Sequence, residues 1–227
     1  MTSAIVTKIV SLRAELPPQV RLIAVTKTRS VAEVRAAYAA GLRDFAESRI
    51  QEALPKQAAL VDLADICWHF IGHLQSNKAK KAIAQFHWLH TGDRLELLER
   101  LNRLAGESTH RPQVCLQVKV RPDPDKYGWS PAELMTALPA LTTYTQIDLA
   151  GLMTILPLGL SAAETLAAFQ DLHQLRATLR QELAQPDALP ELSMGMSGDY
   201  PLAIQAGATM VRLGQAIFGP RSPRTGG

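Results

Sequence analysis

The chain has 227 residues, of which 47% are hydrophobic and 20% are charged, and its formal net charge is +3 at pH 7. This composition is typical of a soluble protein, and the length allows either one α/β barrel or two small domains. No apolar run approaches the length of a membrane span, the first residues lack a secretory signal, and the scattered basic residues exclude a nucleic-acid-binding stripe. We therefore expect a cytoplasmic protein that binds neither membranes nor nucleic acid.

The cysteine pattern agrees with that compartment. Cys67 and Cys115 fall in predicted strands and have neither CxxC nor metal-ligand spacing. Reduced, buried thiols are the simplest interpretation.

The first strand of the chain carries an unusual residue. A helix over 3–16, stopped by two prolines, precedes a buried apolar strand over 20–27 that delivers Lys27 to its end. An ammonium group is costly there unless it reaches water, is ion-paired or reacts as a neutral amine. These three interpretations of Lys27 stay open from this stretch alone.

Strand and helix patterns then alternate with short connections. We predict strands over 20–27, 43–48, 67–72, 87–92, 113–120, 147–155, 189–195 and 209–213. We predict the later helices over 31–40, 49–60, 76–85, 94–107, 130–142, 161–184 and 200–206. This order predicts one (β/α)₈ barrel over 1–221, with the N-terminal helix where an eighth βα helix would lie and a tail over 222–227. A doubly wound open sheet is the alternative.

In a parallel barrel the carboxyl ends of all strands meet at one end, which we call the mouth. The residues expected there include Lys27, Glu47, Ser48, His73, Lys119, Met153, Ser193, Ser197 and Arg212. The glycine-rich turn over 193–199 leads into a helix, and Arg212 and Gly214 close the last strand. Such a turn offers N–H groups and a helix dipole to a phosphate group, although Ser197 or Asp199 could simply cap the helix.

A phosphate site on the last two strands, facing a lysine on the first, is what pyridoxal phosphate (PLP) requires. The PLP aldehyde forms a Schiff base with a lysine while the phosphate is anchored opposite. Arg212 could approach the pyridine nitrogen and, because arginine keeps its proton, would leave that nitrogen unprotonated.

Motifs along the whole chain carry a family resemblance. They are AVTKT from Ala24, FAESRIQE from Phe45, WHFIGHLQSNK from Trp68, GLM from Gly151, LSMGMS from Leu192 and VRLG from Val211. Together they resemble the pyridoxal phosphate homeostasis protein family, and more narrowly its cyanobacterial members. The resemblance implies a fold-type III barrel like the N-terminal domain of alanine racemase.

The same resemblance implies residue roles. Lys27 would be the Schiff-base lysine, Met153 would lie near the ring, and Arg212 would face the pyridine nitrogen or the phosphate. The residues expected around the phosphate are Ser193, Ser197, Gly198 and Gly214, and Met196 is expected to bind the cofactor as well. Ser48 departs from the family, because this chain reads FAES where FGEN is expected, so a serine replaces an asparagine near the cofactor.

Three functions remain open at this point. The resemblance implies a carrier that holds PLP, supplies PLP-dependent apoenzymes and takes part in vitamin B6 and amino-acid or keto-acid homeostasis without strong catalytic activity. We expect a monomer, because the sequence shows no long exposed apolar strip. The alternative is a PLP-dependent racemase or lyase that uses Tyr127 or His73 as its second base. Either residue could instead hold its own loop, and a regulatory module that recognises the loaded barrel is a third reading.

Overall fold

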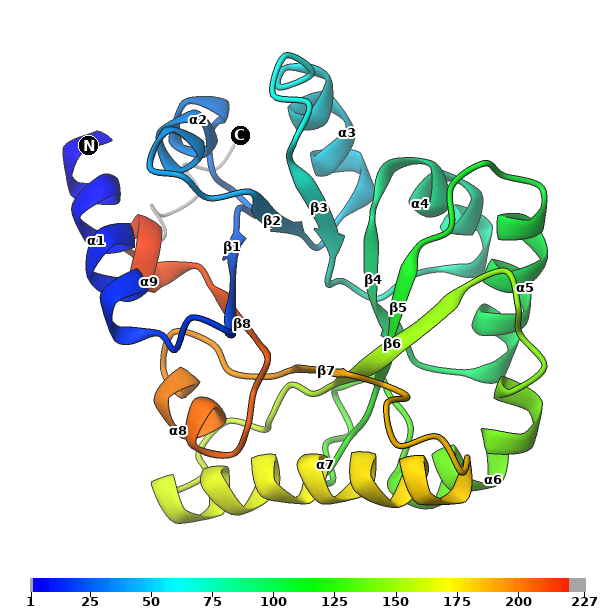
Figure 1. The fold of residues 1–227 in the computed structure, drawn as a ribbon. Helices are drawn as coiled ribbons and strands as arrows, with labels where there is room; N and C mark the ends of the chain where they lie inside the picture. The colour runs from blue at the N-terminus through cyan, green and yellow to red at the C-terminus, as the bar shows by residue number, and fades with distance from the viewer. Residues whose placement is uncertain (1, 221–227) are drawn as a thin grey trace.

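Eight parallel strands close into a barrel in the computed structural model, which describes residues 2–220 (Figure 1). The strands follow chain order around the ring, and β1 pairs with β8. Their bounds are β1 Arg21–Val25, β2 Asp44–Glu47, β3 Cys67–Phe70, β4 Trp88–Gly92, β5 Gln113–Gln117, β6 Asp148–Met153, β7 Glu191–Ser193 and β8 Met210–Leu213. The predicted barrel is therefore confirmed, and the open sheet is excluded.

Helices surround the strands on the outside (Figure 1). They are α1 Thr2–Glu15, α2 Val31–Ala39, α3 Ile50–Ala58, α4 Ala79–Gln85, α5 Leu95–Gly106, α6 Pro131–Leu141, α7 Ala162–Glu182, α8 Tyr200–Gln205 and α9 Gln215–Phe218, with a 3₁₀ turn η1 over Ser76–Lys78. The sequence prediction missed α9, which is the eighth βα helix reduced to about one turn. The N-terminal helix α1 lies beside α2 and α9.

Local sequence signals explain where several helices begin. Ser30, Ser130 and Ser161 each accept a hydrogen bond from a backbone N–H in the first turn of the following helix. In each case a glutamate three residues later binds back to the serine N–H, which completes a capping box. These caps fix α2, α6 and α7 relative to the strands that precede them.

Strand side chains alternate between two environments. On β1, Leu22 and Ala24 pack against the helices, whereas Ile23 and Val25 fill the barrel interior. This alternation is the two-residue period of a strand. Continued by two residues beyond Val25, it directs Lys27 toward the mouth.

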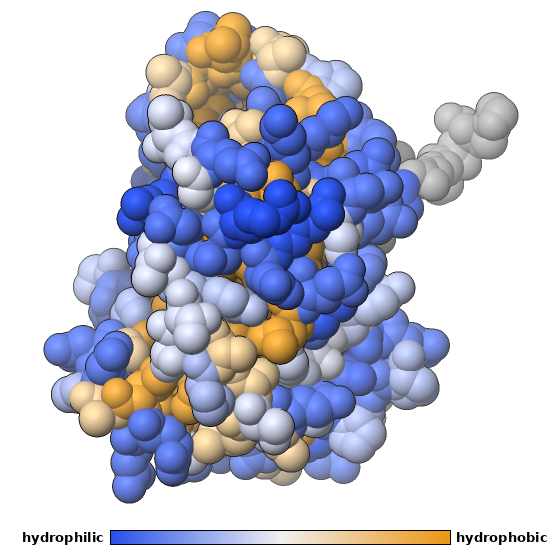
Figure 2. All heavy atoms as spheres, turned by 90° about the vertical axis from the view of Figure 1, so that its right-hand side faces the viewer, coloured by the Kyte–Doolittle hydropathy of each residue, from blue (hydrophilic) through white to orange (hydrophobic). Residues whose placement is uncertain are grey.

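The outer surface suits a chain exposed to water. The face seen in Figure 2 is hydrophilic across its middle, and apolar side chains gather toward its upper and lower parts. Within residues 2–220, no helix is long and apolar enough to cross a membrane. The predicted tail over 222–227 lies outside the described residues.

Candidate functional site

Lys27 follows β1 at the mouth and is half-buried. Its backbone is fixed through its neighbour Thr26, which is fully buried and donates its N–H to the Ala46 carbonyl at 2.9 Å. A Cβ built on Gly214 would lie 3.5 Å from the Cβ of Val25, so the loop after β8 runs beside the end of β1. The structure thus brings Lys27 and Gly214 to the same side of the mouth.

A buried ion pair supports this turn from outside the barrel wall. Lys56 on α3 donates to the Thr26 carbonyl at 2.7 Å and forms an ion pair with Glu47, which also accepts from the Thr26 hydroxyl at 2.7 Å. The sequence prediction placed Glu47 in the mouth. That prediction is wrong, because Ala46 faces the interior and the strand period turns Glu47 toward α3.

The loops after β7 and β8 are joined by one side chain. The Ser197 hydroxyl oxygen accepts from the Gly214 N–H at 3.3 Å and from the Ala216 N–H at 3.1 Å. The neighbouring Gly198 is exposed, and a Cβ added there would meet nothing within 4 Å. The Ser197 and Gly198 N–H groups donate to no acceptor among the described residues.

The turn before α8 is held by its own backbone and one carboxylate. The Asp199 carboxylate accepts from the Met196 N–H at 2.6 Å, and the Met196 carbonyl accepts from Tyr200 at 2.9 Å. The helix α8 has six residues, close to the predicted helix over 200–206, and so short a helix contributes only a small dipole. Loop N–H groups are therefore the main donors offered here.

Arg212 extends from β8 into the barrel and is 3% exposed. Its guanidinium donates to the Ser193 hydroxyl at 2.7 Å and to the Thr154 carbonyl at 2.8 Å. Burial lowers its pKa to about 10, which still leaves it charged at neutral pH. Ser193 is fully buried, so its placement favours support of Arg212 over direct contact with a phosphate group.

Two histidines that the sequence interpretation left without a role continue this network. His90 on β4 lies 2.8 Å from the Ser193 hydroxyl, and His69 on β3 lies 2.9 Å from His90. Asp44, the first residue of β2, lies 3.0 Å from the other ring nitrogen of His69. Strand alternation could have predicted that both histidines face the barrel interior, because Trp68 and Phe70 beside His69, and Leu89 beside His90, pack in the outer core.

The remaining predicted residues lie at or near the mouth. Met153, the last residue of β6, is fully buried and packs in the interior cluster with Ile23 and Val25. Ser48 follows β2 and lines a side cavity of about 160 Å³ that His73 and Lys78 also line. The structure therefore groups Ser48 with the β3 loop.

The β3 and β5 loops touch through aromatic rings. His73 stacks on Tyr127 with ring centroids 3.5 Å apart, and its Nδ1 lies 2.9 Å from Asp93. The Trp129 indole donates to the Gly92 carbonyl at 2.8 Å and is buried, so it anchors the β5 loop to the end of β4. Tyr127 itself is 56% exposed.

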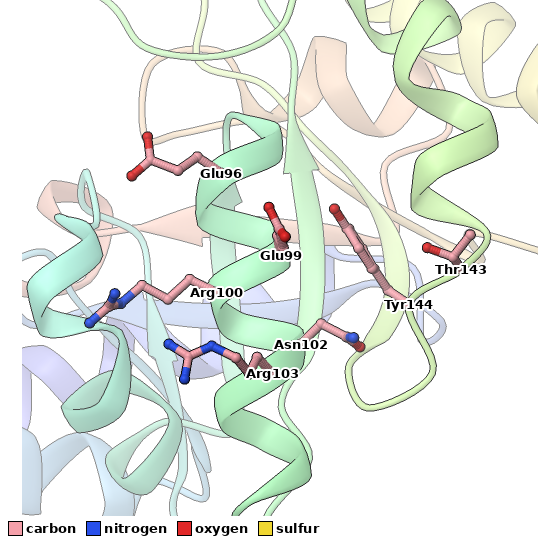
Figure 3. A pocket seen from close by; sticks show the side chains of 7 residues that line it. All are labelled: Glu96, Glu99, Arg100, Asn102, Arg103, Thr143 and Tyr144. Carbon is pink, nitrogen blue, oxygen red and sulfur yellow. The ribbon is translucent and has the colours of Figure 1, made fainter.

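Another hollow lies in the outer layer, between α5 and the segment after α6. Figure 3 shows that its side chains come from Glu96, Glu99, Arg100, Asn102, Arg103, Thr143 and Tyr144. Two carboxylates, Glu96 and Glu99, and two guanidinium groups, Arg100 and Arg103, lie along α5, and charged side chains of both signs are typical of a solvated helix face. This hollow is separate from the mouth and offers no residue that the sequence predicted for the site.

Comparison with known proteins places this geometry in context. The family model for the N-terminal domain of alanine racemase matches residues 2–222. The pyridoxal phosphate homeostasis protein of Synechocystis sp. is 53% identical over 208 residues, which cover 92% of this chain and 94% of that protein. The Pseudomonas aeruginosa protein of the same name is 43% identical, with 90% and 86% covered.

Solved structures agree with the family match and with the match to the homeostasis proteins. PipY of Synechococcus elongatus, solved with PLP bound, is 51% identical with a TM-score of 0.91, covering 95% of this chain and all of that chain. Alanine racemase from E. faecalis shares the fold at 17% identity, with a TM-score of 0.74, and the match covers 97% of this chain and 58% of the racemase. The expected resemblance to cyanobacterial members is confirmed. The chain belongs to the alanine racemase N-terminal domain family and, within it, to the pyridoxal phosphate homeostasis proteins.

Proposed function

We propose that this chain binds PLP reversibly at the barrel mouth and attaches it covalently through the Lys27 amine. The observation that carries the proposal is the meeting of Lys27 with the loops after β7 and β8 at one end of a closed barrel. The proposal is supported by the relative PipY, which was solved with PLP bound.

The residues present fit a phosphorylated aldehyde. Gly198 leaves open space where any other residue would place a Cβ, and the Ser197 and Gly198 N–H groups are available beside it. Neighbouring loop N–H groups form a concavity suited to an anion. We propose that Ser197, Gly198 and Gly214 hold the phosphate and that Met196 and Met153 pack against the cofactor.

Each proposed residue has a separate task. Bound PLP supplies an aldehyde for covalent attachment and a ring that withdraws electrons. Lys27 contributes the amine, and the Glu47–Lys56 pair holds its backbone in place through Thr26. Arg212 presents a fixed cation that keeps its proton, and Ser48 borders the mouth from the β2 side.

We further propose that the chain is a carrier and not a strong catalyst. It would hold PLP as a monomer, supply PLP-dependent apoenzymes and thereby take part in vitamin B6 and amino-acid or keto-acid balance in the cytoplasm. Tyr127, the residue considered as a second base, is half-exposed and stacked on His73, so water reaches it. Strong catalysis would require water to be excluded there.

The binding proposal is tested by the visible spectrum of purified protein incubated with PLP, before and after borohydride reduction. Peptide mass mapping should place the reduced adduct on Lys27, and Lys27→Ala should abolish it while keeping the thermal transition. Lys119→Ala is the matched control, because Lys119 also lies two residues beyond the end of its strand. An adduct retained in Lys27→Ala would refute the assignment.

The carrier proposal needs a transfer assay. Loaded protein is mixed with a PLP-dependent apoenzyme, and recovered enzyme activity is compared with that from an equal concentration of free PLP. Chiral analysis of amino acids incubated with the loaded protein runs in parallel. Sustained racemisation that disappears in Lys27→Ala would overturn the carrier reading in favour of an enzyme.

A further inference from the structure

A row of polar side chains crosses the interior of the barrel. It runs from Asp44 through His69, His90 and Ser193 to Arg212, with links of 3.0, 2.9, 2.8 and 2.7 Å. We call these five residues the relay. It begins at the first residue of β2 and ends near the carboxyl end of β8, so it joins the far end of the barrel to the mouth.

The relay lies among apolar side chains. His69, His90 and Ser193 are fully buried, and the cluster that fills the same interior includes Ile23, Trp88 and Met210. The link between His90 and Ser193 joins β4 to β7, which are not neighbours in the ring, so it crosses the barrel (Figure 1). A buried polar group without a partner is costly, so each member depends on the next.

Hydrogen-bond chemistry gives the relay one direction. A guanidinium only donates, so Arg212 donates to the Ser193 oxygen, and the Ser193 hydroxyl proton is left for His90 Nδ1. Burial lowers the pKa of both histidines, so each ring is neutral and carries one N–H. His90 therefore donates through Nε2 to His69 Nδ1, and His69 donates through Nε2 to the Asp44 carboxylate.

We propose that Asp44, His69, His90 and Ser193 are positioning residues for Arg212, and that the carboxylate at the far end of the barrel thereby affects ligand retention at the mouth. The acceptor at Asp44 selects the tautomer of His69, which selects that of His90. The His90 tautomer then provides an acceptor for the Ser193 hydroxyl proton, which leaves the lone pairs of the Ser193 oxygen directed at Arg212. The last step, from Arg212 to the ligand, rests on the proposed PLP function.

Substitution of Asp44 alters the relay at the end of the barrel that lies farthest from the mouth. Asp44 also faces Arg21, with 4.0 Å between the guanidinium and the carboxylate, and it lies opposite Cys67 in the strand register. Asp44→Leu removes the acceptor, whereas Asp44→Asn removes the charge but keeps an oxygen for His69. Asp148→Leu is the matched control, because Asp148 begins β6, is exposed and lies outside the relay.

The first readout is ¹⁵N NMR of the imidazoles in cofactor-free protein. We expect Nε2–H tautomers for His69 and His90 in the wild type, in Asp44→Asn and in Asp148→Leu, and an altered tautomer population in Asp44→Leu. The second readout is PLP retention, measured from the bound absorption during dialysis. Asp44→Leu and Ser193→Ala should weaken retention about tenfold, equivalent to about 1.4 kcal/mol, and Asp44→Asn should restore most of it.

The outcomes separate the relay from the cofactor proposal. Nδ1–H tautomers in the wild type would overturn the relay, as would an Asp44→Leu protein that matches Asp148→Leu in both readouts. If the wild type binds no PLP, the tautomers of the cofactor-free protein still decide the relay. If Asp44→Leu does not fold, the wild-type tautomers and Ser193→Ala decide it, and unchanged retention in folded Ser193→Ala contradicts the proposal.

Discussion

At the scale of single residues, the Glu47–Lys56 pair is the most heavily buried ion pair next to the proposed site. Glu47 is fully buried and Lys56 is 8% exposed. Removing one partner of such a pair leaves an uncompensated charge in a low-dielectric setting. Lys56→Met should therefore lower the free energy of unfolding by about 3–5 kcal/mol, measured by chemical denaturation.

An exposed ion pair supplies the comparison. Arg35 and Asp62 are paired at 2.7 Å, with side chains 42% and 56% exposed. Arg35→Met should lower the free energy of unfolding far less than Lys56→Met, because water already screens that pair. If Lys56→Met costs no more than Arg35→Met, the buried pair is not a strong support for the turn that carries Lys27.

The two cysteines give a second prediction at this scale. Burial raises the pKa of both Cys67 and Cys115 to about 12, so both stay protonated at pH 8, and the thiolate is the reactive form. A thiol reagent should label both cysteines slowly in the native protein, where Cys67 should react before Cys115 because it is less buried. Both cysteines should react rapidly once the protein is unfolded in denaturant. Rapid native labelling of Cys115 would contradict this.

Sequence reasoning selected some residues of the barrel mouth as site candidates and left others without a role. Lys27 stood out because a charged residue ended a buried apolar strand, and Gly198 and Gly214 because glycines clustered after two strands. His69 and His90 were missed because their partners are 21 and 103 residues apart in the chain. Which interior side chains meet depends on barrel register, and strand period alone does not determine register.

At the scale of elements, the ends of β2 and β3 approach so closely that one glycine decides their spacing. A Cβ built on Gly72 would lie 1.9 Å from the Ser48 carbonyl oxygen, which is backbone and has little room to move. Gly72→Ala should force the two segments apart and lower the free energy of unfolding by about 1–3 kcal/mol. Thermal and chemical unfolding measure this loss.

Gly106 at the end of α5 is the control for that substitution. A Cβ there would meet a flexible Gln146 side chain at 3.3 Å, and the helical backbone already suits alanine. Gly106→Ala should be near neutral or stabilising by up to about 1 kcal/mol. A Gly72→Ala protein as stable as Gly106→Ala would show that the β2 and β3 ends relax freely.

Prediction of helices and strands from the sequence was limited by the length of each element. Strands and long helices were found because buried apolar runs alternate with amphipathic helices and serine caps. The short helix α9 was missed because four residues hold no measurable period, and the predicted helix over 76–85 begins as the separate turn η1. Periodicity also gave no pairing register, so the sequence could not show that Lys56 on α3 is the partner of Glu47.

At the scale of the whole molecule, the buried histidines tie stability to pH. The pKa values of His69 and His90 are lowered by burial, and that of His87 is lowered for the same reason. The unfolded chain therefore binds more protons than the folded one below about pH 6.5. The stability that these histidines contribute is fully present above that pH. As the pH falls below it, the free energy of unfolding should decrease by up to about 1.4 kcal/mol per pH unit for each such histidine.

Denaturant unfolding between pH 7.5 and pH 5 measures this slope. His90→Gln should make the slope shallower by one proton while lowering stability at every pH, because glutamine does not titrate. One experiment separates the two effects. The loss of a titrating group changes how steeply the free energy of unfolding depends on pH, whereas the loss of packing lowers that free energy by the same amount at every pH. An identical slope in the variant would show that His90 does not contribute.

The pairing of β1 with β8 has a consequence for the order of events during folding. Arg21 aligns with Met210 and Ala24 with Leu213, so the last closure joins segments almost 190 residues apart. Lys27 lies on one side of that seam, and Gly214 and Arg212 on the other. Non-local pairing of this kind is slow, because the entropy of a long loop is lost before its contacts form. The ligand site therefore comes into existence only when the seam closes, and a newly made chain should acquire PLP only after β8 has been synthesised and has paired with β1.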